Sequence, residues 1–507
     1  MNAKQVWPRV ALAYAVAVLA GLCIAPAQSP DAGLADKAER GKQAMAEGNF
    51  DAAAQIYAEL VEAVPNNPGL LLNLGMAKHM AGRDREAIPH LQAALKIDPN
   101  IFPANLFLGA SLLRSGDAAK AVPPLQNAAA LQPDSPDVRA MLGDALLELD
   151  RPAEAVEHYQ RLTKLQPEAP GGWVGLGQSY ERLAEGAFSQ LEKAAPESAH
   201  MLVLVAAVRV TQQQYSSAFY LYKQALGKMP SMRGVHQALA EIYRRTGHPD
   251  WAAVEDQKEK ALPPLDCTSE KIDCAWRDEQ FDDVLRLAKS AGEGETAYWQ
   301  VRAYNSLAAQ ALGKLAGLPP SPQRHLVLAD LHGRNGRYVD AVEELRAALK
   351  LAPGHPGLEH ELASALYRAR DYEAAEKLSA KLLGGQPNDA ELNWIRGDSL
   401  LALQKAAESL PPLKRAVEAN PDLLPAHHAL GRAYMQLGQD AAAVPHLKAA
   451  LPLDQDGSLH YQLGQAYRST GQIDLAKQTL STYQRMQREA KEQQRQLQQE
   501  IQITPPQ

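Results

Sequence analysis

Small and apolar residues recur along this chain at a fixed interval of 34 residues. The clearest marker is a Leu-Gly pair, which stands at Leu74-Gly75, Leu108-Gly109, Leu142-Gly143 and Leu176-Gly177. Twelve residues after each of the first three glycines comes an alanine, and twenty-four residues after each comes a proline. A constant period of this length is typical of helix-turn-helix units. The pattern therefore predicts stacked helix pairs, each packed against its neighbours.

Each marker has a physical reason. The glycine allows the first helix to approach its partner closely, although glycine lowers helix stability. The alanine does the same on the second helix, because a larger side chain would separate the pair. The proline ends the second helix, since it lacks an N–H group and its ring clashes with the preceding turn. Short polar turns such as D-P-N and Q-P-D then lead into the next unit.

These residues resemble the tetratricopeptide repeat, whose pattern is Trp-x-x-Leu-Gly-x-x-Tyr followed by Ala, an aromatic residue and Pro. Trp173, Leu176, Gly177 and Tyr180 match its first half. The glycine position can be followed in phase through Gly41, Gly75, Gly109, Gly143, Gly177, Ala206, Ala240, Ala303, Ala329, Ala363, Gly397, Gly431 and Gly464. The resemblance covers roughly residues 35–487. It implies an all-α solenoid, a right-handed superhelix of about 26 to 28 helices in antiparallel pairs.

The middle of the chain departs from the 34-residue period. The step from Gly177 to Ala206 is 29 residues, and the step from Ala303 to Ala329 is 26. We interpret both places as shortened helix pairs that change the curvature of the array. The least regular stretch is 265–300, where we expect a degenerate unit with residues 281–288 as its second helix.

The predicted organisation follows from these phases. It comprises a signal peptide or N-terminal anchor (1–27), a linker (28–34), N-terminal units (35–200), regular units (201–264), degenerate or shortened units with a cysteine pair (265–322), C-terminal units (323–487) and a polar helical tail (488–507). Residues 484–501 should extend the last helix with a polar surface all round. Such a helix gains little from packing, so we expect it to fray or project.

The first residues have the three parts of a secretory signal peptide. Lys4 and Arg9 precede an uncharged apolar stretch at 10–24, and Ala25-Pro26-Ala27 forms an A-x-A cleavage site. The stretch is shorter than the roughly 20 apolar residues that span a bilayer. We expect cleavage after Ala27 and a periplasmic or secreted chain of bacterial type; a membrane anchor at 10–24 is the alternative.

Export changes the interpretation of the cysteines. Cys23 would leave with the signal peptide, so Cys267 and Cys274 remain, and an even number in an oxidising compartment favours a disulfide. Within one continuous helix their Cα atoms would lie about 10 Å apart, beyond the roughly 7 Å that a disulfide allows. A bond therefore requires a loop, which the polar stretch T-S-E-K-I-D can form. Two unlinked small residues are the alternative.

Charge and motifs argue against several classes of function. A net charge of −7 and a pI near 6.1 disfavour a nucleic-acid binder. His360-Glu361 begins a metalloprotease motif, but Ser364 stands where the second histidine belongs, and no other spacing predicts a metal site. Neither G-x-S-x-G nor G-x-x-x-x-G-K-[ST] occurs. We therefore expect no enzyme, no cofactor and no metal.

Candidate binding residues follow from the resemblance, because first helices of this family line the concave face. In the C-terminal units the groove positions include His360, Tyr367, Trp394, Asp398, His428, Arg432, Tyr461 and Arg468. Aromatic and arginine side chains are typical of binding hot spots. In the N-terminal units the positions are mainly apolar: Leu72, Met76, Leu106, Ala110, Leu113, Leu147 and Val174. Packing against neighbouring helices is the alternative for any one of them.

The expected function is a scaffold that holds a protein or peptide partner of the cell envelope in the concave groove. The alternative is an accessory factor that binds polysaccharide in an export system, because aromatic side chains can stack on sugars. We do not expect an enzyme whose catalytic domain is fused to the repeats, because the repeats occupy most of the sequence.

Overall fold

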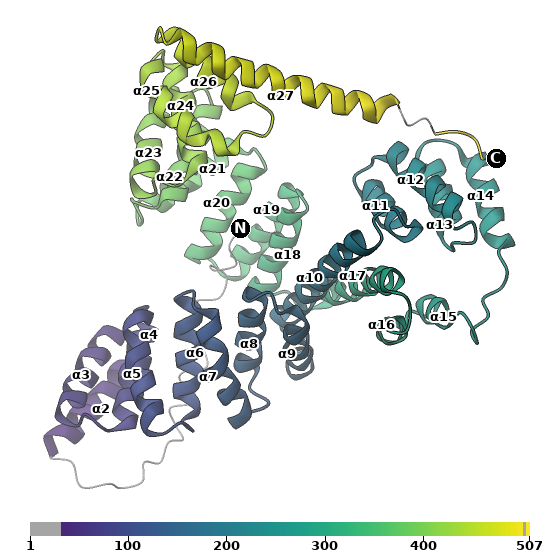
Figure 1. Cartoon of the computed structure of the whole chain (residues 1–507). Coiled ribbons are helices and arrows are strands. Elements are labelled where there is room, and N and C mark those ends of the chain that lie inside the picture. The colour runs from purple at the N-terminus through teal and green to yellow at the C-terminus, as the bar shows by residue number, and fades with distance from the viewer. Residues whose placement is uncertain (1–31, 500–502, 507) are drawn as a thin grey trace. The chain divides into compact units, whose positions relative to one another are not determined.

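The structure is a computed structural model that describes residues 32–499 and 503–506. All regular secondary structure within these residues is helical: 26 α-helices, α2 to α27, and one short 3₁₀ turn, with no strand (Figure 1). The all-α prediction is confirmed, and the number of helices lies in the expected range. The predicted signal peptide lies outside the described residues.

The chain divides into two units. Unit 1 holds residues up to Gly186 together with Arg302–Ala316, and unit 2 holds Ala187–Val301 together with the residues from Gly317 onward. Unit 1 contains α2 (Ala32–Ala46), α3 (Phe50–Ala63), α4 (Pro68–Met80), α5 (Asp84–Ile97), α6 (Phe102–Arg114), α7 (Ala118–Leu131), α8 (Pro136–Glu148) and α9 (Pro152–Leu165). Two long helices, α10 (Pro170–Ala194) and α17 (Glu293–Gly317), have residues in both units.

Regular helix pairs owe their close packing to the repeating glycine. A Cβ atom added to Gly75 would lie 2.6 Å from Cγ of Leu91, and one added to Gly397 would lie 2.5 Å from Cγ of Leu413. In both pairs the leucine comes sixteen residues after the glycine, on the second helix. Ala87 on that second helix is fully buried. The repeating glycine and alanine therefore lie where the two helices of a pair make close contact, as the sequence predicts.

The first irregular stretch has a different structure from the one expected. Gly177 of α10 packs against Leu312 of α17, where an added Cβ would lie 2.7 Å from the leucine Cγ. Tyr180 and Tyr304 stack with their ring centroids 6.2 Å apart, and Ala308 is buried in the same hydrophobic core. The second helix of this pair therefore comes from a segment 135 residues further along the chain.

The expectation of two shortened helix pairs is wrong. Each of these segments is a single helix of 25 residues. The physical reason is that neither segment is interrupted by a proline. No proline occurs between Pro170 and Pro196, or between Glu293 and Pro319.

Unit 2 contains the remaining helices. Before α17 these are α11 (Ala199–Thr211), α12 (Tyr215–Lys228), α13 (Val235–Arg245), α14 (Pro249–Ala261), α15 (Lys271–Arg277) and α16 (Phe281–Ala288). After α17 they are α18 (Pro322–Arg334), α19 (Tyr338–Leu351), α20 (Pro356–Arg368), α21 (Tyr372–Leu383), α22 (Ala390–Ala402), α23 (Ala406–Ala419), α24 (Leu424–Gln436), α25 (Asp440–Ala450), α26 (Ser458–Ser469) and α27 (Ile473–Gln499). The bounds of α16 match the second helix expected in the degenerate unit, and α27 extends into the polar tail as predicted.

A hydrogen bond between successive units recurs at the closing prolines. At five of these prolines, the side chain six residues later lies within hydrogen-bond distance of the proline carbonyl. The pairs are Asn105 with Pro99 (2.8 Å), Arg139 with Pro133 (2.8 Å), Trp173 with Pro167 (2.8 Å), Asn393 with Pro387 (2.9 Å) and His427 with Pro421 (3.0 Å). Each side chain satisfies a carbonyl at the turn between two units. The sequence did not predict this contact, because the position is occupied by Asn, Arg, Trp or His and so carries no repeating residue type.

Candidate binding face on the C-terminal first helices

The eight predicted residues of the C-terminal units lie two on each of four first helices. His360 and Tyr367 are on α20, Trp394 and Asp398 on α22, His428 and Arg432 on α24, and Tyr461 and Arg468 on α26. We call this set the C-terminal face. Helix α20 contacts α22, which in turn contacts α24. Residues about one repeat apart can therefore touch across neighbouring units.

Four of the eight residues form one connected cluster. The Tyr367 hydroxyl donates to Oδ2 of Asp398 at 2.6 Å, and Nη1 of Arg432 donates to Oδ1 of the same carboxylate at 3.3 Å. The rings of Tyr367 and Trp394 meet edge to face, with centroids 5.0 Å apart. The cluster thus links α20, α22 and α24 through one carboxylate.

The environment of the cluster is partly desolvated. The side chain of Asp398 is 13% exposed and that of Arg432 is 35% exposed. Burial raises the pKa of Tyr367 well above its ordinary value, and the adjacent Asp398 carboxylate adds to the rise. The tyrosine therefore stays a hydrogen-bond donor at physiological pH. These contacts fix the side chains in place before any partner binds.

The two histidines of the face have different environments. Nε2 of His360 lies 3.6 Å from Oδ2 of Asp389, which raises the pKa of the imidazole and lowers that of the carboxyl. The other carboxylate oxygen, Oδ1, caps α22 by accepting from the Leu392 N–H at 2.8 Å. Burial lowers the pKa of His428, and Arg432 lowers it further. Nε2 of His428 and Oε1 of Gln462 are both buried, and the Gln462 side chain, as a hydrogen-bond partner, opposes the fall in the pKa of His428.

Tyr461 and Arg468 lie apart from this cluster. Tyr461 packs against Tyr483 of α27, with ring centroids 5.2 Å apart. Both tyrosines line a pocket of about 260 Å³, together with Asp456, Ser458, Gln462 and Gln487. Arg468 is exposed in the last turn of α26. The eight residues therefore share one series of helices without forming one continuous contact network.

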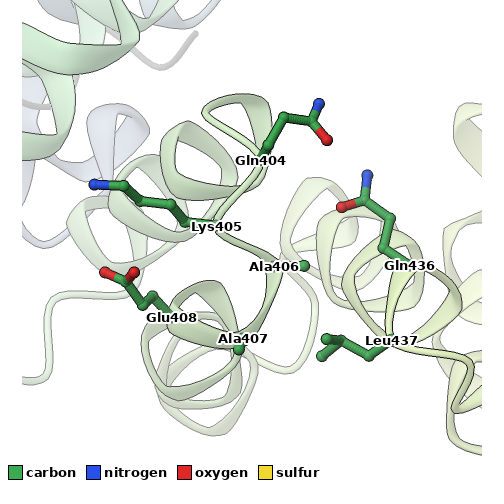
Figure 2. Close-up of a pocket in the computed structure, with 7 residues that line it drawn as sticks. All are labelled: Gln404, Lys405, Ala406, Ala407, Glu408, Gln436 and Leu437. Carbon is green, nitrogen blue, oxygen red and sulfur yellow. The ribbon is translucent and has the colours of Figure 1, made fainter.

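A larger depression of about 650 Å³ lies between the turn after α22 and the end of α24 (Figure 2). Its lining residues are Gln404, Lys405, Ala406, Ala407, Glu408, Gln436 and Leu437. None of the predicted binding residues is among them. Lys405 and Glu408 are exposed to solvent, so the depression supplies no buried polar group that could orient a ligand.

The apolar set of the N-terminal units is mainly core. Leu72, Met76, Ala110 and Leu147 are each less than 9% exposed. Leu106 and Leu113 are partly buried and pack against the same core. For these residues the packing alternative is the better interpretation, because their side chains fill the space between helices.

One cluster in unit 1 superficially resembles a nucleophilic site. Nδ1 of His79 lies 2.6 Å from Oδ1 of Asp84 and 2.9 Å from Oγ of Ser111. Nε of Arg114 lies 2.9 Å from Oδ2 of Asp84. Ser111 is fully buried. Asp84 and Ser111 both contact the same nitrogen, Nδ1 of His79. His79 therefore cannot take the serine proton at Nδ1 while that nitrogen is bonded to Asp84. The cluster joins α4, α5 and α6, and the sequence analysis did not identify it.

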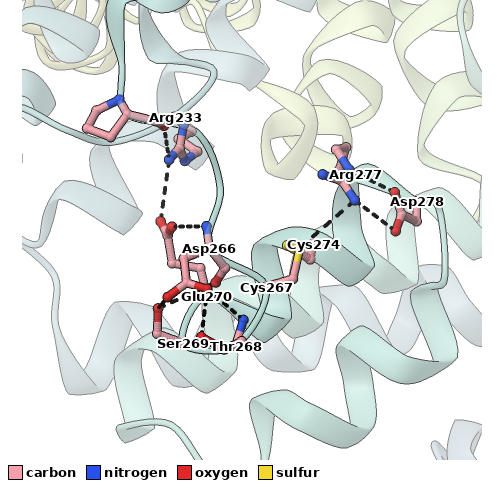
Figure 3. The surroundings of a disulfide bond; sticks show 10 residues. Arg233, Asp266, Cys267, Thr268, Ser269, Glu270, Cys274, Arg277 and Asp278 are labelled. Atoms are coloured by element: carbon pink, nitrogen blue, oxygen red, sulfur yellow. Dashed lines mark hydrogen bonds and ion pairs between the residues drawn. A yellow bond between two sulfur atoms is a disulfide. The ribbon is translucent and has the colours of Figure 1, made fainter.

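The two cysteines of the degenerate unit lie together (Figure 3). Their Cα atoms are 5.7 Å apart and their Sγ atoms 2.00 Å apart. Cys267 precedes α15, whereas Cys274 lies within it, so the intervening segment is not one continuous helix. Asp266 organises the preceding turn by accepting hydrogen bonds from the N–H and hydroxyl groups of Thr268.

The described residues offer neither a metal site nor a membrane-spanning helix. No group of three or more His, Cys, Asp or Glu side chains in residues 32–499 and 503–506 is placed to hold a metal ion. Within the same part of the chain, no helix combines the length and the apolar character that a membrane span requires. The apolar stretch at 10–24 lies outside it.

Two known proteins are similar in sequence to parts of this chain. DnaJ homolog subfamily C member 3 of Gallus gallus is 24% identical over 220 residues, which are 38% of this chain and 43% of that protein. Protein FlbA of Caulobacter vibrioides is 27% identical over 135 residues, which are 27% of this chain and 23% of that protein. The chain thus spans less than half the length of either relative.

Solved structures are also similar to parts of the chain. A crystal structure of MamA shares 23% identity and covers 39% of this chain and 92% of its own, with a TM-score of 0.29. MamA of Desulfovibrio magneticus RS-1, from residue 41 to its end, shares 22% identity and covers 33% and 96%, with a TM-score of 0.30.

Family models give the most extensive match. Models described as tetratricopeptide repeat match residues 44–105, 112–173, 293–356, 334–393, 426–459 and 457–489. Together these segments make up more than half of the chain, and they include both the N-terminal and the C-terminal arrays. The chain belongs to the tetratricopeptide repeat family.

Proposed function

We propose that this chain is a non-enzymatic scaffold of the bacterial cell envelope that binds an extended peptide or protein segment on the C-terminal face. Membership of the repeat family supports protein interaction in general. The observation that carries the specific proposal is the cluster of Tyr367, Trp394, Asp398 and Arg432 across three first helices. It combines aromatic rings with a partly exposed arginine, as binding hot spots do.

The arrangement favours a partner with both apolar and polar groups. Asp398 neutralises part of the Arg432 charge, so the face is not a simple cationic pocket. The guanidinium still has donors that make no hydrogen bond to the described chain, and these can reach a carbonyl or carboxylate oxygen. A segment that buries an apolar side chain against Trp394 and presents an oxygen to Arg432 fits this chemistry.

The test begins with residues 28–507 as bait in an envelope extract. Any recovered partner is then titrated against Trp394→Ala and Arg432→Ala variants. Loss of a buried aromatic or arginine anchor typically costs at least about 2 kcal/mol of binding, or roughly a thirtyfold loss of affinity. Arg415→Ala is the matched control, because Arg415 is exposed on the second helix α23.

Helicity of each variant is measured in parallel. Unchanged affinity in both Trp394→Ala and Arg432→Ala, with the fold intact, would move the site away from this face. Retention on polysaccharide columns rather than peptide columns would favour the polysaccharide alternative.

Export is a separate part of the proposal and rests on the pattern of residues 1–27. Cells that produce the full chain should yield a mature protein that begins at residue 28. The measurement is the N-terminal sequence and intact mass of the protein from each cell fraction. An uncleaved N-terminus in the membrane fraction would support the anchor, and an uncleaved cytoplasmic chain would contradict export.

A further inference from the structure

Residues 503–506, with the sequence Ile-Thr-Pro-Pro, follow the last helix and lie against α13. The hydroxyl of Tyr243 donates a hydrogen bond to the main-chain carbonyl of Thr504 at 2.6 Å, across 261 residues of sequence. Both residues belong to unit 2. The period of the repeats gives no reason for this contact, because residues 503–506 are not part of any repeat.

Tyr243 is held as a fixed donor by its surroundings. Its side chain is only 1% exposed. The ring lies 5.6 Å from that of Phe219 on α12 and 5.6 Å from that of Trp251 on α14, measured between centroids. Burial raises the pKa of the hydroxyl to about 12. A buried tyrosine hydroxyl needs an acceptor, and the Thr504 carbonyl supplies it.

The docked segment has the chemistry of an extended peptide ligand. It carries no charge, and Thr504 precedes a proline, which disfavours a helical conformation. Two successive prolines favour a polyproline II conformation, so little conformational entropy remains to be lost on binding. Ile503 and Pro506 are partly buried, whereas Thr504 and Pro505 are exposed. The two apolar ends are therefore the more covered residues of the segment, and the bonded carbonyl lies between them.

Helix α27 gives this segment a stiff tether. It contains 27 residues, which corresponds to about 40 Å of helix. Its side chains from Gln487 to Glu492 are exposed, so that part of the helix gains little from packing. Because the segment belongs to the same chain, its binding at Tyr243 is an intramolecular event, which raises its effective concentration above that of a free peptide. A weak contact at Tyr243 is thereby populated within the chain.

We propose that the helices α11–α14 form a second peptide-binding site, centred on Tyr243, and that residues 503–506 of the same chain occupy it. The site accepts an uncharged, extended Ile-Thr-Pro-Pro segment through its Thr504 carbonyl and its two apolar ends. It uses none of the residues of the C-terminal face, so it stands independently of the function proposed above.

The test uses the full chain and a fluorescein-labelled peptide of sequence Gln-Ile-Thr-Pro-Pro-Gln. Ile503→Ser combined with Pro506→Ser disables the segment without altering any helix. The labelled peptide should bind this double variant at least about tenfold more tightly than the unaltered chain, whose own segment competes. Adding Tyr243→Phe to the double variant removes the donor and keeps the ring. It should weaken peptide binding by about three- to tenfold.

Tyr467→Phe in the same double variant is the matched control. Tyr467 is a buried tyrosine at the equivalent repeat position of α26, and its substitution should leave the peptide affinity unchanged. Absence of peptide binding to the double variant, or an equal effect of both tyrosine substitutions, would overturn the proposed site. Equal binding to the unaltered chain would overturn its occupation by residues 503–506. Sedimentation provides a second check on this occupation. If the unaltered chain forms a dimer that the double variant does not form, the occupant is residues 503–506 of a second copy, and occupation within one chain is overturned.

Discussion

Replacement of Gly177 by alanine tests the pairing of α10 with α17. The added Cβ would lie 2.7 Å from both Cγ and Cδ2 of Leu312, about 1 Å inside ordinary carbon–carbon contact. Cγ is the branch point of the leucine side chain, so rotation about the Cβ–Cγ bond moves only the methyl carbons and cannot relieve the overlap at Cγ. Overpacking of this kind costs about 1–3 kcal/mol. The higher helix propensity of alanine stabilises α10 by about 1 kcal/mol relative to glycine. The net destabilisation is therefore up to about 2 kcal/mol.

Gly186→Ala is the matched control on the same helix. No atom lies within 4 Å of a Cβ added at Gly186, so only the helix propensity changes. This variant should be more stable than the unaltered chain by roughly 0.5–1 kcal/mol. The free energies of local opening in the two variants should therefore differ by about 1–3 kcal/mol.

Amide hydrogen exchange read by mass spectrometry is the suitable assay, because repeat arrays open locally and a single unfolding free energy is poorly defined for them. In Gly177→Ala, exchange should rise in residues 170–186 and 302–316 together. In Gly186→Ala, neither segment should exchange faster. A Gly177→Ala variant with slower exchange in α10 and unchanged exchange in residues 302–316 would refute the pairing.

Two further predictions concern titration and redox state. Burial raises the pKa of Asp144 to about 6, above the roughly 3.9 of an unfolded chain. The stabilisation that protonated Asp144 contributes to the folded state is therefore complete below about pH 4, and it is lost as pH rises through about 6. Relative to Asp144→Asn, the unaltered chain should lose up to about 3 kcal/mol between these limits in urea titrations; parallel pH profiles would contradict this. Reduction of the Cys267–Cys274 bond, which closes a separation of seven residues, should destabilise α15 and α16 by about 2 kcal/mol. Proteolysis with and without reductant measures this effect, and alkylation of both thiols in the unreduced chain would show that no bond forms.

The regular part of the fold could be predicted because its contacts are local in sequence. Gly75 meets Leu91 and Gly431 meets Leu447, in each case sixteen residues later, so one period describes the whole pair. For Gly177 the residue sixteen positions later is Lys193, which lies on the same helix. The other glycines of the register are each followed sixteen residues later by leucine or tyrosine, so the charged Lys193 was the available signal. The sequence could not name Leu312 as the replacement, because periodicity carries no information on distant partners.

The candidate binding face could be predicted to a similar extent. Asp398 and Arg432 are 34 residues apart, and the period alone places them at the same position of neighbouring units. The sequence did not predict that Tyr483 of α27 packs against Tyr461, because the length of the final helix lies outside the repeat. For the same reason it did not predict the contact of Tyr243 with residues 503–506.

The pairing of α10 with α17 also constrains the order in which the chain folds during synthesis. Most units can close as soon as their second helix leaves the ribosome, because its contacts are with residues just made. Helix α10 must instead wait for Leu312, 135 residues after Gly177, which corresponds to roughly 7–27 s at ordinary elongation rates. During that interval the apolar face around Leu176 and Tyr180 lacks its native cover. During synthesis this junction is therefore a point at which the nascent chain is open to aggregation or to capture by a chaperone.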